Sequence, residues 1–311
     1  MMDGNQALAR RIENMSPARR ALVERRLRGA GSVSVGKSSR WSPLVEIQRG
    51  TSKSTLFGIH PLTGTVTYYL ELARSIDEGL TFQGIQARGL NEGDEPHTSM
   101  EAMAAYYVEA LREVQPEGPY MLMGYSLGSH IAYEMAQQLR AAGSGVSLLA
   151  FLDTSRSDSN TGFDGEFDDA AYWYLRYRKT LDVQLNELRS LDPEAQIDYI
   201  VERLRRSDDQ PSYMSMPHAN PHRMLKIEKS NHQALFTYRH KPYAGPITLL
   251  RTAERDASPS DPPDMGWAAY AGGGLTVHRV PGCHQTLLFS PHVETVGRVL
   301  KGCIADATQG T

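Results

Sequence analysis

Residues 119–143 read PYMLMGYSLGSHIAYEMAQQLRAAG, and this stretch decides the fold class. Its first six residues form a short apolar run, which predicts a strand at 119–124. Apolar residues then recur at helical spacing, which predicts a helix over 127–143. A strand that leads directly into a helix is the repeating unit of parallel α/β sheets, so this stretch indicates an α/β fold.

The chain on both sides of this stretch alternates in the same way. Further strands are predicted at 44–48, 55–59, 81–87, 146–153, 247–253 and 275–280, and further helices at 66–76, 100–114 and 292–304. The strand at 146–153 has six apolar residues among its first seven, as expected for a strand buried on both faces. Thr98 and Glu101 have the spacing of a capping box before the helix at 100–114. The pattern predicts a mostly parallel, doubly wound sheet.

Residues 155–240 interrupt this alternation. They contain three helix-like segments, at 169–181, 192–206 and 222–238, which are joined by polar and proline-rich links. We therefore predict one domain over 44–311, in which the sheet carries an inserted helical lid at about 155–240.

Residues 1–43 differ from the rest of the chain in charge. Residues 1–40 carry nine Arg and Lys against three Asp and Glu, a net charge of +6 in a chain whose total is −3. Ser16-Pro17 predicts the start of a basic helix, and GAGSVSVGKSS at 29–39 predicts a flexible linker. A solvated helix is the favoured interpretation, and a docking element for an acidic partner is the alternative. The linker also matches a phosphate-binding loop pattern, but no buried strand precedes it, so we interpret the match as chance.

The composition excludes several classes of protein. A charge of −3 over 311 residues gives no nucleic-acid footprint. No run approaches the roughly 20 apolar residues of a membrane-spanning helix, and the N-terminus lacks the apolar core of a secretory signal. Two cysteines, Cys283 and Cys303, are too few for a disulfide framework or a cysteine zinc site. We expect a cytoplasmic globular protein that binds neither nucleic acid nor membrane.

The chemistry begins at Gly124-Tyr125-Ser126-Leu127-Gly128, a serine between two glycines at the turn from strand to helix. This context is the nucleophile elbow, in which a tight turn exposes the serine at the start of a helix. The helix dipole and the free N–H of Leu127 can then stabilise an oxyanion. We predict that Ser126 is a nucleophile.

A serine nucleophile needs a base, and the chain has ten histidines. His284 follows the last predicted strand, within the sequence VPGCHQ. That loop lies at the carboxyl edge of the sheet, where open α/β sheets place their sites. We therefore predict that His284 is the base and that the other histidines are surface, capping or core residues.

Two carboxylates are candidates for the acid that orients this histidine. Asp153 ends the apolar strand at 146–153, where a buried charge requires a partner such as an imidazole. Asp256 follows the strand at 247–253 in a polar, proline-rich loop, where a solvated acid needs no partner. Both satisfy the chain order serine, acid, histidine. Asp153 is favoured, and Asp256 stays open.

Several further motifs give the chain a family resemblance over residues 44–306. They are GIHPLTG (58–64), QARGL (86–90), VQPEGPY (114–120), GYSLGSHIAYEMAQQL (124–139), AFLDT (150–154), PYAGPITLLR (242–251), DMGW (264–267) and VPGCHQTLL (280–288). In these the chain resembles the thioesterase domains that release products from non-ribosomal peptide and polyketide synthases. Ser129 and Cys283 differ from the usual pattern, which has a glycine and a small polar residue at these positions.

The resemblance implies an α/β-hydrolase fold and a triad of Ser126, His284 and Asp153. It also implies an oxyanion hole from the backbone N–H groups of Leu62 and Leu127. The substrate would be an acyl or peptidyl chain on the phosphopantetheine of a carrier protein or an upstream synthase module, with no metal and no bound cofactor. The chain shows no carrier segment of its own, so we expect delivery in trans or excision from a larger protein.

Three functions follow from this resemblance. The first is release of the acyl chain through an acyl-serine, by hydrolysis or cyclisation. An acid after the strand at 146–153 is typical of this product-releasing type, whereas editing thioesterases usually carry it near the position of Asp256. The second is a free-standing editing thioesterase or small-acyl esterase of the same fold. The third is a non-catalytic carrier-binding module.

Two other segments also acquire roles from the resemblance. SPARRALVERRL (16–27) resembles linkers that join synthase modules. The aromatic residues of the lid are expected to pack, and lining of an acyl pocket is the alternative; they are Tyr172, Trp173, Tyr174 and Tyr177.

Overall fold

The computed structural model describes residues 41–52, 54–156, 168–208, 214, 220–257 and 262–309. The basic helix and linker predicted in residues 1–40, including the phosphate-loop match, lie outside the described residues. No helix within the described ranges combines the length and apolarity needed to cross a bilayer.

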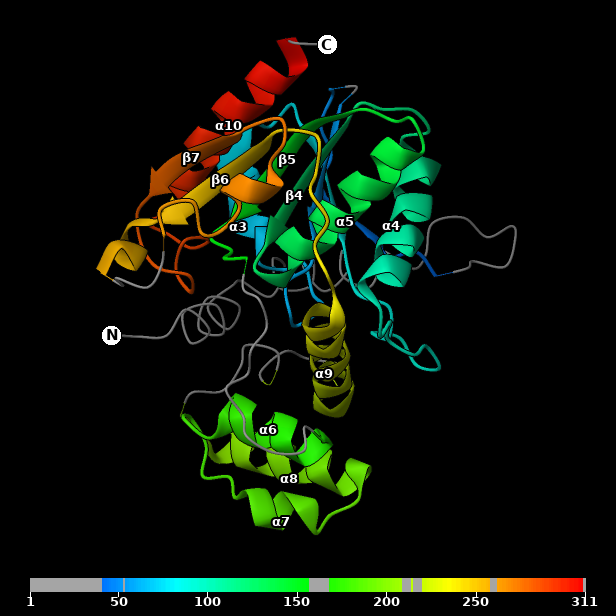
Figure 1. Ribbon diagram of the computed structural model, residues 1–311, viewed down its shortest axis with the longest axis vertical. Helices are drawn as coiled ribbons and strands as arrows, with labels where there is room; N and C mark the ends of the chain where they lie inside the picture. Colours follow the sequence, from blue (N-terminus) through cyan, green and yellow to red (C-terminus); the bar gives the residue numbers. More distant parts are fainter. Residues whose placement is uncertain are drawn as a thin grey trace, which may run out of the picture.

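The described residues form one seven-stranded sheet in the order β1-β3-β2-β4-β5-β6-β7 (Figure 1). The strands are β1 Leu44–Gln48, β2 Thr55–Ile59, β3 Thr81–Ile85, β4 Tyr120–Tyr125, β5 Val146–Leu152, β6 Ile247–Thr252 and β7 Leu275–Val280. β1 pairs antiparallel with β3, and every other pair in the sheet is parallel. The predicted mostly parallel, doubly wound sheet is therefore confirmed.

Helices cover both faces of this sheet (Figure 1). They are α3 Tyr69–Ile76, α4 Met100–Val114, α5 Leu127–Ala141 and α10 Val293–Gln309. The apolar faces of α4 and α5 share one hydrophobic cluster with the strands, and those of α3 and α10 share a second. Because both faces of the sheet are covered, β4 is buried at all six of its positions.

One predicted helix cap and one predicted helix start are wrong. Ser99, not Thr98, is the N-cap of α4: its Oγ accepts a hydrogen bond from the N–H of Ala102 at 3.3 Å and donates one to Glu101 at 2.8 Å. The serine has the extended backbone that a capping residue needs, and its hydroxyl reaches an amide of the first turn. α3 begins at Tyr69 rather than at residue 66, because the chain first makes tight turns.

Within the described residues, four helices lie between β5 and β6, in the segment predicted to be a lid. They are α6 Asp169–Tyr177, α7 Leu185–Arg189, α8 Pro193–Arg206 and α9 Pro221–Thr237; α7 was not predicted from the sequence. Tyr172, Trp173 and Tyr177 are buried in a hydrophobic cluster of these helices, with Tyr174 packed against it, which favours the packing interpretation of the aromatic residues.

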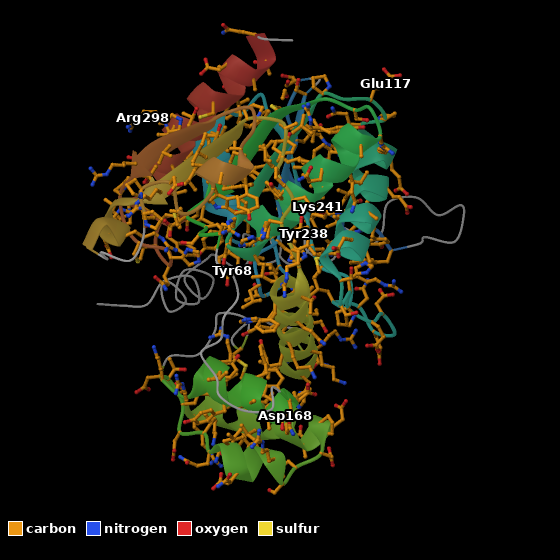
Figure 2. All side chains as sticks on the ribbon, viewed as in Figure 1. Tyr68, Glu117, Asp168, Tyr238, Lys241 and Arg298 are labelled. Atoms are coloured by element: carbon orange, nitrogen blue, oxygen red, sulfur yellow. The ribbon has the colours of Figure 1, made fainter. Side chains whose placement is uncertain are left out.

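α9 leads from this helical group back to the sheet. α6, α7 and α8 form a group apart from the sheet, and α9 ends beside α5 (Figure 1). Asp168 lies at the start of α6 in the group, while Tyr238 and Lys241 lie where the chain reaches α5 (Figure 2). There Tyr238 donates a hydrogen bond to Glu134 of α5. The two ends of α9 therefore contact different parts of the molecule.

Candidate active site

Ser126 occupies the turn between β4 and α5. Its φ of 55° and ψ of −127° lie in a strained region that L-residues rarely adopt. A Cβ added at Gly124 would lie 2.1 Å from the carbonyl carbon of Gly128, and one added at Gly128 would lie 2.4 Å from the carbonyl oxygen of Ile59. Both flanking glycines are therefore required by close backbone approach, as the elbow motif predicts.

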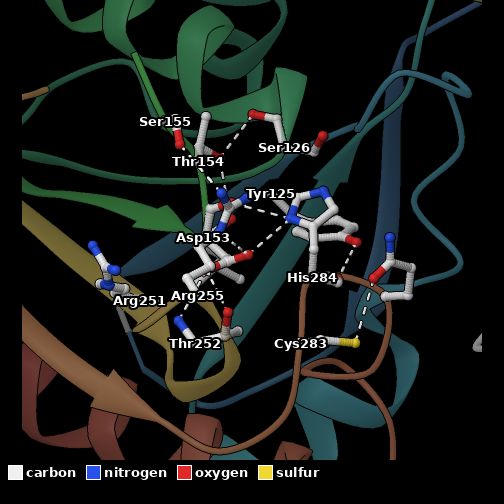
Figure 3. A network of polar contacts seen from close by, with 12 residues as sticks. Tyr125, Ser126, Asp153, Thr154, Ser155, Arg251, Thr252, Arg255, Cys283 and His284 are labelled. Carbon is white, nitrogen blue, oxygen red and sulfur yellow. Dashed lines mark hydrogen bonds and ion pairs between the residues drawn. The ribbon is translucent and has the colours of Figure 1, made fainter. Parts of the chain in front are cut away.

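Asp153 and His284 meet at the carboxyl edge of the sheet, although 131 residues separate them. Asp153 directly follows β5, and His284 follows β7. The imidazole Nδ1 lies 3.0 Å from Asp153 Oδ2 and 3.0 Å from the Asp153 carbonyl oxygen (Figure 3). The Tyr125 ring packs against the imidazole with centroids 4.8 Å apart, and its hydroxyl donates to the His284 carbonyl at 2.6 Å. These contacts hold the ring with Nε2 turned away from Asp153.

Ser126 lies beside the imidazole on the side away from Asp153 (Figure 3). Its carbonyl accepts a hydrogen bond from Thr154 Oγ1 at 3.1 Å, which holds the turn against the residue after Asp153. No hydrogen bond joins Ser126 Oγ to His284 Nε2 within the described part of the chain. Such bonds commonly form only when the substrate is bound. The structure thus brings the three predicted residues together, without a hydrogen bond between the serine and the histidine.

The Asp153 carboxylate is buried and receives several hydrogen bonds. Its Oδ1 accepts from the N–H of Thr252 at 2.9 Å and from Thr252 Oγ1 at 2.8 Å, and its Oδ2 accepts from Arg255 Nε at 2.8 Å. Burial by itself raises the pKa of this carboxyl, but the bonds from His284 and Thr252 and the Arg255 guanidinium outweigh burial and hold the pKa at about 2. Asp153 is therefore ionised at neutral pH and can stabilise an imidazolium.

Arg255 and Thr252 are members of this cluster that the sequence analysis did not predict. The polar loop after β6 appeared solvated, yet Arg255 also donates to the Asp153 carbonyl at 3.1 Å and to Ser155 Oγ at 3.3 Å. One indication of this contact was present in the sequence: the cation Arg255 follows β6, and β6 ends at the same edge of the sheet as β5. Asp256 follows it in the 3₁₀ helix Ala253–Ala257, and its side chain lies outside the described residues.

The low pKa of Asp153 predicts a pH-dependent stability. A carboxyl whose pKa falls from 3.8 in the unfolded chain to about 2 in the folded protein stabilises the fold above pH 4 and loses that effect as pH falls toward 2. We expect the free energy of unfolding of the wild type, relative to Asp153→Asn, to fall by about 2 kcal/mol over this interval. Urea unfolding between pH 2 and 6 measures the difference. A difference that stays constant with pH would contradict the assignment.

Leu62 and Leu127, the two predicted oxyanion donors, both follow strands that end at the carboxyl edge of the sheet. β2 and β4 are parallel neighbours in which Ile59 is paired with Gly124. Leu62 stands three residues beyond Ile59, and Leu127 stands three beyond Gly124, so both follow the same edge. Leu127 is the first residue of α5, where N–H groups have no acceptor within the helix. Neither N–H donates a hydrogen bond within the described ranges, so both are available to a ligand.

His60 directly follows β2, just before Leu62, and has a different environment from His284. It is fully buried, its Nδ1 lies 2.8 Å from the Pro61 carbonyl oxygen, and its Nε2 lies 2.7 Å from the Tyr107 hydroxyl. Burial lowers its pKa to about 4. His60 is thus a core residue, one of the three roles expected for the histidines other than His284.

The described residues contain no group of three His, Cys, Asp or Glu side chains that could hold a metal ion. Cys283 and Cys303 are both free thiols. Cys283, next to His284, contacts Gln285 and Thr286 through its sulfur at 3.3 and 3.4 Å.

Comparison with known proteins places this chain in a family. Residues 54–303 match the family model of the thioesterase domain. The chain is 39% identical over 110 residues to a dimodular nonribosomal peptide synthase of Bacillus subtilis (strain 168), a match that covers 35% of this chain and 5% of that protein. The chain thus spans a small fraction of the length of this curated relative.

Solved structures agree with the sequence match. A four-domain nonribosomal peptide synthetase, holo-AB3403, superposes with a TM-score of 0.69 at 28% identity, covering 86% of this chain and 20% of that one. The Vlm2 thioesterase domain superposes with a TM-score of 0.60 at 24% identity, covering 84% and 96%. The second likeness supports the fold alone. With its family match over most of its length and its parallel sheet, this chain belongs to the thioesterase domain family and has the α/β-hydrolase fold.

Proposed function

We propose that this domain releases an acyl or peptidyl chain from the phosphopantetheine thioester of a carrier protein, through an acyl-serine on Ser126. The observation that carries the proposal is the contact of His284 with the buried Asp153 beside a serine on a strained elbow. In a chain of the thioesterase family, this arrangement fits nucleophilic catalysis. The proposed triad is Ser126, His284 and Asp153, and the proposed oxyanion donors are the N–H groups of Leu62 and Leu127.

In the first half of the reaction, Ser126 becomes acylated. His284 Nε2 accepts the hydroxyl proton as Ser126 Oγ attacks the thioester carbonyl carbon. The carbonyl oxygen becomes an oxyanion that accepts hydrogen bonds from Leu62 and Leu127. The carbon–sulfur bond then breaks, and the pantetheine sulfur takes the proton from the imidazolium. Asp153 orients Nδ1 and stabilises the imidazolium without accepting its proton.

In the second half, His284 removes a proton from water or from a hydroxyl or amine of the bound chain. The resulting nucleophile attacks the acyl-serine carbonyl through a second oxyanion, and Ser126 Oγ leaves with the proton from His284. Water yields a free acid, and an internal nucleophile yields a ring. The helical group α6 to α9 is proposed as the lid that shapes the acyl site and limits access of water.

Relatives of the chain support a carrier-bound substrate. The peptide synthase of Bacillus subtilis and the four-domain synthetase are multidomain proteins, and this chain matches a small part of each. An upstream carrier domain is therefore the proposed partner. An acid after β5 also fits the product-releasing type, whereas an editing enzyme or small-acyl esterase is the second candidate. For the basic segment before residue 44, docking to this partner stays the alternative to a solvated helix.

Incubation of the protein with an acylated carrier protein, followed by intact mass measurement, tests this function. We expect an acyl adduct on the protein, followed by a released product whose mass shows hydrolysis or cyclisation. The same acyl group on a p-nitrophenyl ester serves as the matched comparison. Faster turnover of the simple ester than of the carrier thioester would favour the esterase, and no adduct from either donor would favour the non-catalytic module.

A further inference from the structure

Asn231 of α9 donates a hydrogen bond from Nδ2 to the carbonyl oxygen of Leu62 at 2.9 Å. The asparagine is 1% exposed, and its bond to the Leu62 carbonyl is partly buried. Leu62 also carries one of the two N–H groups proposed for the oxyanion hole. The asparagine therefore holds the peptide plane that directly follows the proposed oxyanion donor.

The peptide plane that joins Pro61 to Leu62 is held by other residues. Its carbonyl, that of Pro61, accepts from the N–H of Gly64 at 2.9 Å and lies 2.8 Å from His60 Nδ1. Because Nε2 of the same ring lies 2.7 Å from the Tyr107 hydroxyl, that hydroxyl can donate to Nε2 while Nδ1–H donates to Pro61. In a trans peptide the N–H points opposite to the carbonyl, so fixing the Pro61 oxygen sets the direction of the Leu62 N–H.

We propose that Asn231 is a positioning residue of the oxyanion hole. Through its hydrogen bond to the Leu62 carbonyl, the direction of the Leu62 N–H depends on the position of α9 and therefore on the lid. This inference rests on the proposed function of the site. Asn231 touches no reacting atom in it. Its role is to hold the Leu62 carbonyl, and so to reduce rotation of the two peptide planes that flank Leu62.

The other contacts of α9 tie it to the lid. Glu228, which is 1% exposed, pairs with Arg176 of α6, and Lys229 pairs with Asp169 at the start of α6. A third ion pair, between Lys226 and Glu194, joins α9 to α8. One helix therefore contacts the lid through charged side chains and the oxyanion loop through Asn231.

α9 also packs directly against the turn that contains Leu62. A Cβ added at Gly64 would lie 2.7 Å from a methyl carbon of Ile227, one turn before Asn231. This contact leaves the turn little room to move independently of α9. A displacement of α9 when an acyl chain enters the lid would therefore reach the Leu62 peptide both by packing and by the hydrogen bond.

The chemistry of the contact requires an amide. The Leu62 carbonyl is an acceptor, and an unpaired buried acceptor is costly. Asparagine supplies an uncharged N–H donor on a short side chain. Leucine at this position has nearly the same size but no donor, whereas glutamine keeps the donor on a longer arm. These two substitutions therefore separate the hydrogen bond from the packing.

The test compares Asn231→Leu, Asn231→Gln and, as a matched control, Gln233→Leu, which makes the same amide-to-leucine change at an exposed position of α9. Because loss of a whole oxyanion donor costs about 10²–10³ in kcat, we expect misdirection of one donor by Asn231→Leu to lower kcat about 10- to 100-fold. KM for the acyl-pantetheine thioester should stay within about twofold, since the contact is used in the transition state. Asn231→Gln should recover part of kcat, and Gln233→Leu should match the wild type.

Inhibitor binding provides a second measurement, which a merely structural role of Asn231 would not affect. A trifluoromethyl ketone analogue forms a tetrahedral oxyanion with Ser126, whereas an amide analogue of the thioester stays in its ground state. Asn231→Leu should weaken binding of the ketone by the same factor as kcat and leave binding of the amide unchanged. Equal weakening of both analogues would overturn the proposal, because it would indicate a damaged acyl site.

The experiments distinguish failure of this inference from failure of the proposed function. If the wild type forms an acyl adduct that Ser126→Ala lacks, the function stands whatever Asn231 does. Unchanged kcat and ketone affinity in Asn231→Leu would then overturn the positioning role alone. Should the leucine variant not fold, as judged by its melting temperature, Asn231→Ala replaces it with the same expected split between kcat and KM.

Discussion

Ser126→Ala is expected to lower the rate of acyl release from a carrier protein by about 10⁴-fold or more, the loss typical of a missing serine nucleophile. Alanine removes the oxygen that accepts the acyl group, while the elbow backbone and the Leu127 N–H stay in place. We expect no acyl adduct on the variant in intact mass spectra. Single-turnover rates with acylated carrier protein measure the loss.

Cys283→Ala provides the matched control, since Cys283 is the other nucleophilic side chain next to His284. Its sulfur contacts Gln285 and Thr286, not Asp153 or Ser126. We expect this variant to keep turnover and the acyl adduct. Persistent turnover in Ser126→Ala together with loss in Cys283→Ala would transfer the nucleophile role to the thiol.

Asp153→Asn is expected to lower kcat by about 10⁴-fold, as loss of the orienting carboxylate does in other triads. An amide at this position can present its N–H to His284 Nδ1, which favours the wrong tautomer of the imidazole. It also leaves the Arg255 guanidinium without the carboxylate that it contacts at 2.8 Å. Asp256→Asn should keep activity near that of the wild type. Steady-state kinetics of the two variants, with melting temperatures as a check on folding, make the comparison.

The opposite result has a definite meaning. If Asp256→Asn silenced the enzyme while Asp153→Asn stayed active, the acid would follow β6 instead of β5. The editing type of thioesterase would then become the favoured reading. Asp153 would remain a structural carboxylate that anchors Arg255 and Thr252 at the edge of the sheet.

Local sequence patterns predicted most of the fold. Each strand of the sheet was predicted within two residues of its observed bounds, because short apolar runs specify buried strands. The elbow was equally readable, since Gly124 and Gly128 are demanded by backbone contacts within the turn and with the neighbouring β2. The capping box at Thr98 and the undetected α7 show where local patterns are weak. Adjacent hydroxyl residues compete as caps, and a five-residue helix gives too short a period.

Both the sequence and the tertiary structure were needed to define the candidate site. Chain order and position after a strand were sufficient to select Ser126, His284 and Asp153 as residues at one edge, because the carboxyl ends of parallel strands meet there. The same reasoning left Asp256 open, since it also follows a strand. The tertiary structure shows that the His284 loop, which follows β7, reaches across β6 to Asp153, the residue after β5.

The sequence by itself determined the alternation of strands and helices, the strained elbow and the set of candidate residues for the site. The reason is that backbone conformation and burial are set largely by neighbouring residues. The tertiary structure alone decided which side chains meet. Arg255 reaches Asp153 across 102 residues, and Asn231 reaches the Leu62 carbonyl across 169. Contacts at such separations follow from strand order and helix packing, and no local pattern in the chain encodes them.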